Sequence, residues 1–500
     1  MAPRSVLSPV LFLAVVAALS GCKVGPNYRS PAVMSPPSAW QDGLLEASTQ
    51  PAVSTRPAEL TRWWQTLGDP ELTSLVERAL GSSTNVAQAR ARLRQARAQR
   101  GVVVGGLFPN ISDAAEYQRG EASERSTSGV PGAGKPTPHS LFQNSVDASW
   151  ELDVFGGLRR SVEAADASVL AAQESLRDVQ VSTAAEVALD YVQLRGLQQE
   201  IVIAKENLAT QQHTAGIVRE RQAAGFVSAL DVANAQAQVA TTQSTIPPLE
   251  TSARQTIYAL SVLVSAYPGD LLQELSRPGP VPLVPVEVPA GLPSDLLRRR
   301  PDIRAAEANL HAATAEIGVA TAQLYPSFAL TGSMSWQSTK LANWFDSSSR
   351  SWSVGPTANW AIFQGGSLIS NIRVQQALRD QAYITYVNTV ETAVEDVDSA
   401  LVGLAQEQLH RAELTDAVTF NRQAVDLSMK LYTEGNTDFL NVLNAQRSLF
   451  AVEVALVQSD STLATDLVSL YKALGGGWED QSAAPGKPLV IPTTAPAAGQ

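Results

Sequence analysis

The sequence is poor in the side chains that most often carry chemistry: it has one cysteine and four histidines among 500 residues. The single cysteine cannot form a disulfide within the chain. The histidines are isolated from the cysteine and from one another, so no spacing typical of a zinc site or a catalytic triad is present. The Gly-Gly pairs lack a following Lys-Ser or Lys-Thr, which argues against a phosphate-binding loop. The sequence therefore predicts no enzyme, no metal and no cofactor.

The sequence also lacks long apolar runs and blocks of like charge. Beyond the N-terminal region there is no stretch of 18 consecutive apolar residues, so a membrane-spanning helix is not expected. The 48 acidic and 37 basic residues give a net charge of −11 that is spread along the chain, which excludes a nucleic-acid-binding surface. If the chain crosses a membrane, strands closed into a barrel must do so, because only helices and closed barrels satisfy every backbone polar group in lipid.

The N-terminus is typical of a secretion signal with an acylation site. Arg4 supplies a basic start, Val10 to Leu19 is apolar but too short to span a bilayer, and small residues come immediately before Cys22. This arrangement predicts a signal peptide over residues 1–21 and a Cys22 that is acylated and becomes the mature N-terminus. The alternative is an ordinary signal with an incidental cysteine. Lys23 follows, and by resemblance to bacterial lipoproteins the absence of Asp at this position favours the outer membrane.

An internal duplication organises the rest of the chain. The segments Asn85-Val86 and Leu107-Phe108-Pro109 recur 217 residues later as Asp302-Ile303 and Leu324-Tyr325-Pro326, and further matches follow at an offset of 210. Each copy has the same succession of a helix, two strands around a polar loop, a long helix, a glycine turn and a returning helix. The resulting division is an extended segment at 22–60, a first repeat at 61–265, a linker at 266–300, a second repeat at 301–476 and a disordered tail at 477–500.

The helices show the periodicity of coiled coils. Apolar residues recur every seven positions from Val232 to Leu260 and again from Val442 to Leu470, and such repeats keep one stripe of a helix against a partner. The long helices are expected at about 158–224 and 368–434, and about 65 residues at ~1.5 Å each give a rod of about 100 Å. Pro247-Pro248 should break or kink the first returning helix.

Four segments alternate between apolar and polar residues, as the strands of a membrane barrel do. They include Asn110, Val146, Phe328 and Trp352, and several carry tryptophans near their ends. A water-facing sheet packed on a core is the alternative interpretation. Four strands cannot close a barrel, whereas three chains would supply twelve and leave an open lumen. The predicted fold is therefore mainly α with membrane β: a trimeric 12-stranded β-barrel, with four strands per chain, continued by a long α-helical coiled-coil barrel.

Several motifs distributed along the chain carry a family likeness. They are Cys22-Lys23-Val24-Gly25-Pro26-Asn27-Tyr28, Trp63-Trp64, Asp69-Pro70-Glu71-Leu72, Gly291-Leu292-Pro293-Ser294-Asp295-Leu296-Leu297, Arg300-Pro301-Asp302-Ile303 and Leu324-Tyr325-Pro326. Together they resemble the TolC-like outer-membrane factors, specifically the NodT-type efflux lipoproteins, over nearly the whole chain. The resemblance implies a homotrimer held in outer-membrane lipid and extending into the periplasm. It also implies docking to a periplasmic adaptor (membrane fusion) protein and to an inner-membrane pump of the resistance-nodulation-division (RND) type.

The resemblance further implies two sites in the helical part. The hairpin turns would contact the adaptor, and glycine suits their tight reversal because it tolerates positive φ. The alternative is that these residues only turn the chain. The turn residues are Arg221, Gly225, Ser228, Asp231, Gly435, Thr437 and Asp438. Tyr432, Leu440 and Asn444 match positions that constrict the closed tunnel in the family, which often has Asp where this chain has Asn444. Asp438 or Asp231 would then supply the carboxylate instead.

These features predict a passive, gated conduit that is the outer-membrane channel component of a tripartite efflux system. It would export small toxic compounds or drugs from the periplasm to the exterior. The alternatives are an exit duct for type I protein secretion or for metal-ion efflux, and a structural coiled coil of the envelope. The last alternative does not account for the strands between the helices.

Overall fold

The computed structural model describes residues 23–31, 52–54, 60–121, 123, 137–282, 284, 287–289 and 299–478. Cys22, the signal peptide and most of the predicted tail lie outside these ranges. The chain divides into two compact units, and each unit combines segments from both halves of the sequence. Residues 1–31, 94–171 and 306–386 form unit 1, whereas residues 32–93, 172–305 and 387–500 form unit 2.

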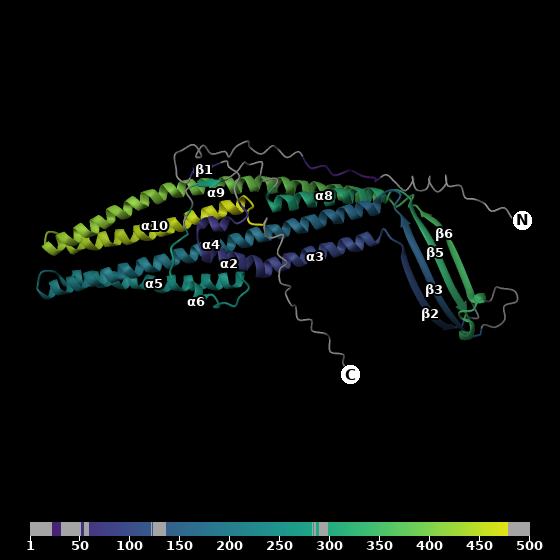
Figure 1. The fold of residues 1–500 in the computed structure, drawn as a ribbon, viewed down its shortest axis with the longest axis horizontal. Coiled ribbons are helices and arrows are strands. Elements are labelled where there is room, and N and C mark those ends of the chain that lie inside the picture. The colour runs from purple at the N-terminus through teal and green to yellow at the C-terminus, as the bar shows by residue number, and fades with distance from the viewer. Residues whose placement is uncertain are drawn as a thin grey trace. The chain divides into compact units, whose positions relative to one another are not determined.

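Unit 1 contains a four-stranded antiparallel sheet (Figure 1). Its strands in spatial order are β2 (Asn110–Gly120), β3 (His139–Leu152), β5 (Ser327–Ser338) and β6 (Arg350–Asn359). All four predicted strands are present. β3 begins earlier than the alternation suggested, and β6 ends before Trp360, whose indole N–H donates instead to the carbonyl oxygen of Leu324 (3.0 Å).

The register of this sheet gathers the apolar side chains of its strands on one face. Val146 of β3 lies opposite Met334 of β5, which in turn lies opposite Trp352 of β6. On the other side of β3, Ala148 lies opposite Ile111 of β2. Residues directly opposite one another in antiparallel strands point to the same side of the sheet. Trp352 and Ile111 are each 70% exposed, so this apolar face is not covered by any described part of the chain.

The opposite face of the sheet is polar. Hydroxyl groups of β5 and β6 form cross-strand hydrogen bonds between Ser333 and Ser353 (2.8 Å) and between Ser335 and Ser351 (2.7 Å). Cross-strand pairs of this kind stabilise a register. The sheet therefore separates an apolar face from a hydroxyl-lined face, as the sequence alternation predicted.

Two long helices, each followed by a returning helix, make up most of the helical residues of the described chain. α4 (Gly157–Ala223) is followed by α5 (Ala229–Leu263), and α9 (Ser367–Glu434) is followed by α10 (Phe439–Ala473). In Figure 1, α5 returns along α4 and α10 returns along α9. The ends of both long helices lie within one residue of the predicted ones. Among the helices of the described ranges, none combines the length and the apolar character that a membrane crossing requires.

The expected break at Pro247-Pro248 is absent, because α5 continues through both prolines. Each proline removes the N–H that would bond a carbonyl one turn earlier, here the carbonyls of Gln243 and Ser244. These residues and both prolines are exposed, so water can hydrate the freed carbonyl oxygens. Thr251 also donates its hydroxyl to the carbonyl oxygen of Pro247 (2.9 Å). Of the break or kink that was expected, the break does not occur, because the prolines lie on the solvent-exposed side of the helix.

Two shorter helices precede α4, and one precedes α9. α3 (Thr84–Gly105) and α8 (Pro301–Ala322) lie where the repeats predicted them. α2 (Pro70–Ser82) was not predicted. Its start has a clear signal in hindsight, because Asp69 accepts hydrogen bonds from two backbone N–H groups of the first turn and is followed by proline at the first helical position. The pairing of Asp69 with Pro70 therefore marks a helix start that periodicity alone does not reveal.

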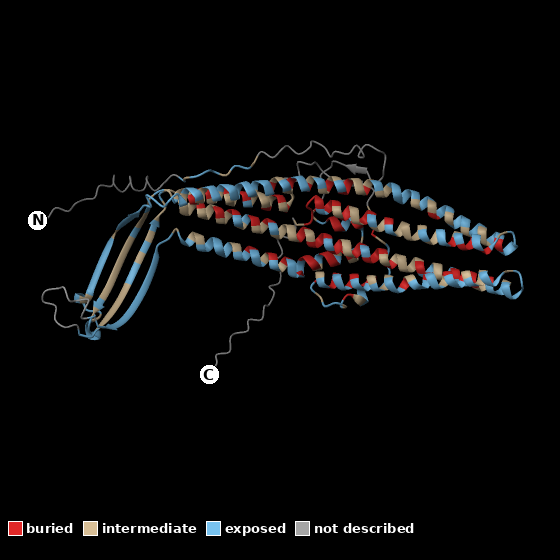
Figure 2. Cartoon of the chain, turned by 180° about the vertical axis from the view of Figure 1, so that it is seen from behind, coloured by how far each residue is buried: buried red, intermediate tan, exposed pale blue. Residues whose placement is uncertain are grey.

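The core of unit 2 is built around adjacent tryptophans. Trp63 and Trp64 are 0% and 1% exposed, and Trp63 stacks on Tyr471 of α10 with ring centroids 5.3 Å apart. Figure 2 shows buried residues gathered along the helices and few in the strands. Trp478, which the predicted tail included, packs under the guanidinium group of Arg177 at 4.3 Å.

Two short strands in unit 2 were also not predicted. β1 (Ala52–Ser54) pairs in parallel with β4 (Glu287–Pro289). The first lies in the segment expected to have no regular structure, and the second lies in the predicted linker. A one-turn helix, α6 (Leu272–Leu275), lies in the same linker. Three-residue strands lack a periodicity that a sequence could display, and only pairing with a distant segment defines them.

Candidate functional site

The first described residues, Lys23–Pro31, form a strap that packs on helices of unit 1. The backbone N–H of Val24 donates to the carbonyl oxygen of Phe155 (3.2 Å). Arg160 of α4 is only 1% exposed, and it donates to the carbonyl oxygen of Val24 (3.1 Å) and to Oδ1 of Asn27 (2.6 Å). A buried guanidinium group that finds backbone acceptors in this way holds the strap against α4.

Two glycines and one aromatic stack complete the packing of the strap. Gly25 has φ of +85°, and a Cβ at this residue would lie 2.5 Å from Cα of Gly318 in α8. Glycine is therefore required both by the backbone conformation and by the close approach. Tyr28 stacks on His311 of α8 with ring centroids 4.3 Å apart and donates its hydroxyl to Glu307 (3.0 Å). The strap thus links α4 and α8, which belong to different repeats.

The two hairpin turns have the same backbone geometry. Gly225 has φ of +80° and Gly435 has φ of +81°, the left-handed region that L-residues rarely adopt. In the first turn, Ser228 and Asp231 form a capping box, in which each side chain bonds the backbone N–H of the other. In the second turn, the side chain of Asp438 makes no cap hydrogen bond. The carboxylate of Asp231 is thus engaged in capping α5, whereas that of Asp438 is not used for capping.

Arg221 joins the two turns. It donates to the carbonyl oxygen of Thr433 (3.0 Å), and its guanidinium group lies 4.8 Å from the ring centroid of Tyr432. Tyr432 is 2% exposed and its hydroxyl is buried without a hydrogen-bond partner in the described chain. Burial raises the pKa of Tyr432, the Arg221 charge opposes the rise, and the hydroxyl stays neutral. Arg221 is therefore a direct link between the end of α4 and the end of α9.

The predicted constriction residues do not share one environment. Tyr432 packs in a small core with Phe439 and Val442, whereas Leu440 is 56% exposed and Asn444 is exposed. Leu440 and Asn444 are one turn apart on α10 and so lie on one face of that helix. The structure therefore brings two of the three residues together on an open face and places the third in the packing between the helices.

Above the turns, α4 meets α10 along a row of polar residues that we call the seam. The row consists of Asn207, Gln211 and Thr214 on α4 and of Gln446 and Glu453 on α10. Asn207 donates to Glu453 (3.0 Å), and Gln446 donates to the hydroxyl of Thr214 (3.0 Å). These residues were not identified from the sequence. Asn207, Gln211 and Thr214 nevertheless follow the alternating spacing of four and three that is typical of a helix interface.

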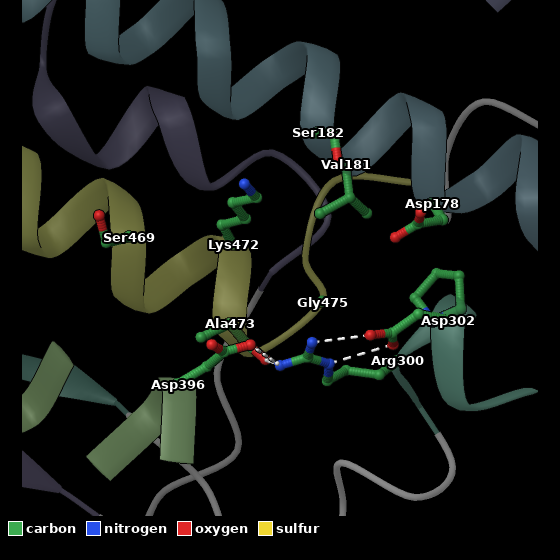
Figure 3. Close-up of a pocket in the computed structure, with 11 residues that line it drawn as sticks. Asp178, Val181, Ser182, Arg300, Asp302, Asp396, Ser469, Lys472, Ala473 and Gly475 are labelled. Atoms are coloured by element: carbon green, nitrogen blue, oxygen red, sulfur yellow. Dashed lines mark hydrogen bonds and ion pairs between the residues drawn. The ribbon is translucent and has the colours of Figure 1, made fainter. Parts of the chain in front are cut away.

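A cavity of about 240 Å³ lies in unit 2 between α4, α8, α9 and α10 (Figure 3). On its wall, Arg300 donates to Asp302 (2.7 Å) and to Asp396 (3.0 Å), and it also donates to the carbonyl oxygen of Ala473 at the end of α10 (3.1 Å). Asp178 faces the same cavity, and burial, followed by the charge of Asp302, raises its pKa. Arg300 thus ties the start of the second repeat to both helices that end it.

A second group of charges links α2 to α6. Arg78 donates two hydrogen bonds to Glu274 (2.8 and 3.3 Å). Burial raises the pKa of Glu71 to about 7, with further contributions from its hydrogen bond to Glu274 and from the charge of that carboxylate, while Arg78 and Arg195 lower it. The pKa of Glu274 is lowered despite its burial, because Glu71 and Arg78 donate to it. The proton shared by the two carboxyl groups therefore resides on Glu71.

In the described ranges, no group of three or more His, Cys, Asp and Glu side chains is arranged to hold a metal ion. The features that recur are instead a sheet with one open apolar face and two helical hairpins joined by polar contacts. They define a channel-forming subunit of an outer membrane. The family model "Outer membrane efflux protein" matches residues 75–265 and 292–476, and the chain belongs to this family.

Individual relatives agree with this assignment along nearly the whole chain. The toluene efflux pump outer membrane protein TtgF of Pseudomonas putida is 32% identical, with 95% of this chain and 98% of the relative covered. Nodulation protein T of Rhizobium leguminosarum is 31% identical, with 92% of each covered. The solved structure of the outer-membrane channel OprN is 34% identical with a TM-score of 0.84, covering 91% of this chain and all of that one. The chain is thus an outer-membrane efflux channel protein and not an enzyme.

Proposed function

We propose that this chain is one of three identical subunits of a gated exit channel in a tripartite efflux system, and that it releases small toxic compounds to the exterior. The observation that carries the proposal is the register of the sheet. Four strands share one exposed apolar face and one hydroxyl-lined face, which suits lipid on one side and a wet lumen on the other.

The trimer follows from the two edges of the sheet. β2 and β6 each pair on one side only within the described chain, so both leave a row of backbone N–H and C=O groups open. Such groups are costly in lipid and must be paired with another chain. Three copies give twelve strands in a closed ring, and the duplicated helices, with repeats at 61–265 and 301–476, give a wall of approximately sixfold symmetry.

The strap supports acylation of Cys22, which lies outside the described residues. Cα of Lys23 is 2.9 Å from the position that a Cβ of Gly156 would occupy, and Gly156 lies at the junction of β3 and α4. Lys23 is therefore held beside the end of β3, and acyl chains attached one residue away along the chain can reach the leaflet that surrounds the apolar face. More than one acyl chain provides the stable anchoring that a single chain does not.

The hairpin turns are the proposed docking surface for a periplasmic adaptor, which connects the channel to an inner-membrane pump of the RND type. Phe226 and Leu230 add to the predicted turn residues, because they are 75% and 67% exposed beside the first turn. Exposed apolar side chains at a turn mark a binding surface. Arg221 and the seam hold the two hairpins together, and separation of the hairpins opens the channel, with Leu440 and Asn444 facing the lumen.

Three measurements test this proposal. Deletion of the gene should raise susceptibility to several small apolar toxicants, with toluene as the first because a relative is named for it. Unchanged susceptibility together with retention of a secreted polypeptide or of metal ions would favour the other export routes. The purified trimer should also conduct ions in planar bilayers, and a preparation that never conducts would argue against a channel.

Cys22→Ser should abolish labelling with radioactive fatty acid, whereas labelling that persists would refute the anchor.

A further inference from the structure

The two hydrogen bonds of the seam define its register. From Asn207 to Thr214 the chain advances seven residues along α4, and from Glu453 to Gln446 it goes back seven residues along α10. Both pairs therefore belong to one antiparallel register. Gln211 lies four residues after Asn207, so it faces the level of Leu449, an apolar residue. The register leaves Gln211 without a polar residue opposite it on α10.

Gln211 is buried and has no hydrogen-bond partner among the described residues. Its side chain is 3% exposed, and both its amide nitrogen and its amide oxygen are buried without a partner in the described chain. Its neighbours on the seam differ, because Thr214 and Gln446 are 2% and 4% exposed and bond each other. A buried amide without partners destabilises the packed state, because the same group bonds water when the helices separate.

The burial of Gln211 occurs within one chain, between the two hairpins. The small core of Val218, Val442 and Tyr432 lies between the seam and the turns and holds the hairpins together. The seam therefore combines apolar contacts that favour packing with one amide that opposes it. A polar residue at a packing position of a coiled coil lowers the stability of the packed helices. It can therefore shift the equilibrium between packed and separated helices.

We propose that Gln211 is a positioning residue of the gate, which raises the fraction of separated hairpins by making their packed state less stable. The proposal rests on the function proposed above, in which separation of the hairpins opens the channel. It predicts opposite effects for two residues of the same row. Removal of the amide at Gln211 stabilises packing, whereas removal of the hydroxyl at Thr214 leaves Gln446 unpaired and weakens packing.

The experiment measures separation of the hairpins and conduction independently. Spin labels at Glu220→Cys and Ser448→Cys, two exposed positions outside the predicted constriction, report the distance between α4 and α10 in the full-length trimer. Gln211→Leu should lower the ratio of separated to packed hairpins about tenfold, which corresponds to ~1.4 kcal/mol. Thr214→Val should raise the ratio, and the exposed neighbour Gln212→Leu should leave it unchanged. Single-channel open probability should follow the same order.

The outcomes separate the inference from the function on which it rests. A ratio that is unchanged or raised by Gln211→Leu, or that moves in the same direction for both seam variants, overturns the role of Gln211. Shifts of the ratio in the expected order without any conduction leave that role in place and overturn the gate. Gln211→Met, which keeps the length of the side chain, gives the same test if the leucine variant does not assemble.

Discussion

The strap in unit 1 and the seam in unit 2 both join α4 to a helix of the second repeat, but they do so with different chemistry. The strap uses a fully buried arginine, Arg160, whose guanidinium group bonds backbone carbonyls, the Asn27 side chain and Glu163 (2.9 Å). The seam uses amides, one hydroxyl and the carboxylate of Glu453, and one of its amides, Gln211, is buried without a hydrogen-bond partner in the described chain. A buried charge whose hydrogen bonds are satisfied stabilises the contact between two elements. A buried neutral group without hydrogen-bond partners destabilises that contact.

The largest effect is expected when the strap loses its central cation. Arg160→Ala removes a buried side chain, takes this donor from the backbone carbonyls of Val24 and Gly25 and from the Asn27 side chain, and leaves Glu163 without its nearest cation. The variant should lose ~3 kcal/mol or more of unfolding free energy. Thermal unfolding of the detergent-solubilised protein and protease cleavage after Lys23 measure the loss. An unfolding temperature equal to that of the wild type would mean that the strap does not depend on this arginine.

The next effect tests the close approach between α8 and Arg160 of α4. A Cβ at Gly318 would lie 2.8 Å from Cγ of Arg160, so Gly318→Ala should cost about 1–3 kcal/mol of unfolding free energy through overpacking. Gly216 of α4 is the matched control, because a Cβ there meets nothing within 4 Å. Gly216→Ala should stabilise the protein by about 0.5–1 kcal/mol through helix propensity. Equal effects of the two substitutions would show that the approach is looser than described.

A smaller effect is expected at the turns. Arg221→Ala removes one hydrogen bond to Thr433 and one cation–π contact with Tyr432, which together contribute ~1 kcal/mol at this half-exposed position. Open probability in planar bilayers should rise about fivefold. Arg219→Ala, a change at an exposed residue two positions earlier, is the control and should not change it. A fall in open probability for Arg221→Ala would contradict the role of this link.

The smallest effect concerns pH and the carboxyl pair in unit 2. The pKa of Glu71 is raised to about 7 in the folded protein from an ordinary value of 4.5, so the folded state binds more protons than the unfolded state between these values. Its contribution to unfolding free energy is therefore fully present below about pH 4.5 and is lost as the pH rises through 7. Glu71→Gln should reduce this pH dependence, as chemical denaturation from pH 5 to pH 8 would measure. An unchanged slope would show that another group titrates.

Much of the fold could be predicted from the sequence because it repeats. The seven-residue spacing located both returning helices, the repeated succession of segments placed α4 and α9, and the alternation of apolar and polar residues located the strands. Elements without a period were missed: α2 is announced only by Asp69 and Pro70, and β1 exists only through its pairing with β4. Of the break or kink expected at Pro247-Pro248, the break does not occur, because local propensity does not include the water available on the exposed side of a helix.

The candidate site could be predicted only in part. Glycine at the two turns was recognisable because positive φ is a local demand that few other residues meet. The contacts of Arg160, Arg221 and Arg300 were not recognisable, since each reaches a backbone carbonyl that lies far away in the sequence. Tyr432 was expected at a constriction, yet the structure places it in the packing between α4, α9 and α10.

The sequence by itself determined the long helices, the returning helices and the four strands of the sheet, and which of their faces are apolar, because periodicity is a property of consecutive residues. Only the tertiary structure decided which side chains meet. Gln211 is an ordinary polar residue in the sequence, and its lack of a partner arises from the register between α4 and α10, whose paired residues lie more than 200 positions apart. Contacts between such distant segments depend on how long helices lie against each other, which no local pattern specifies.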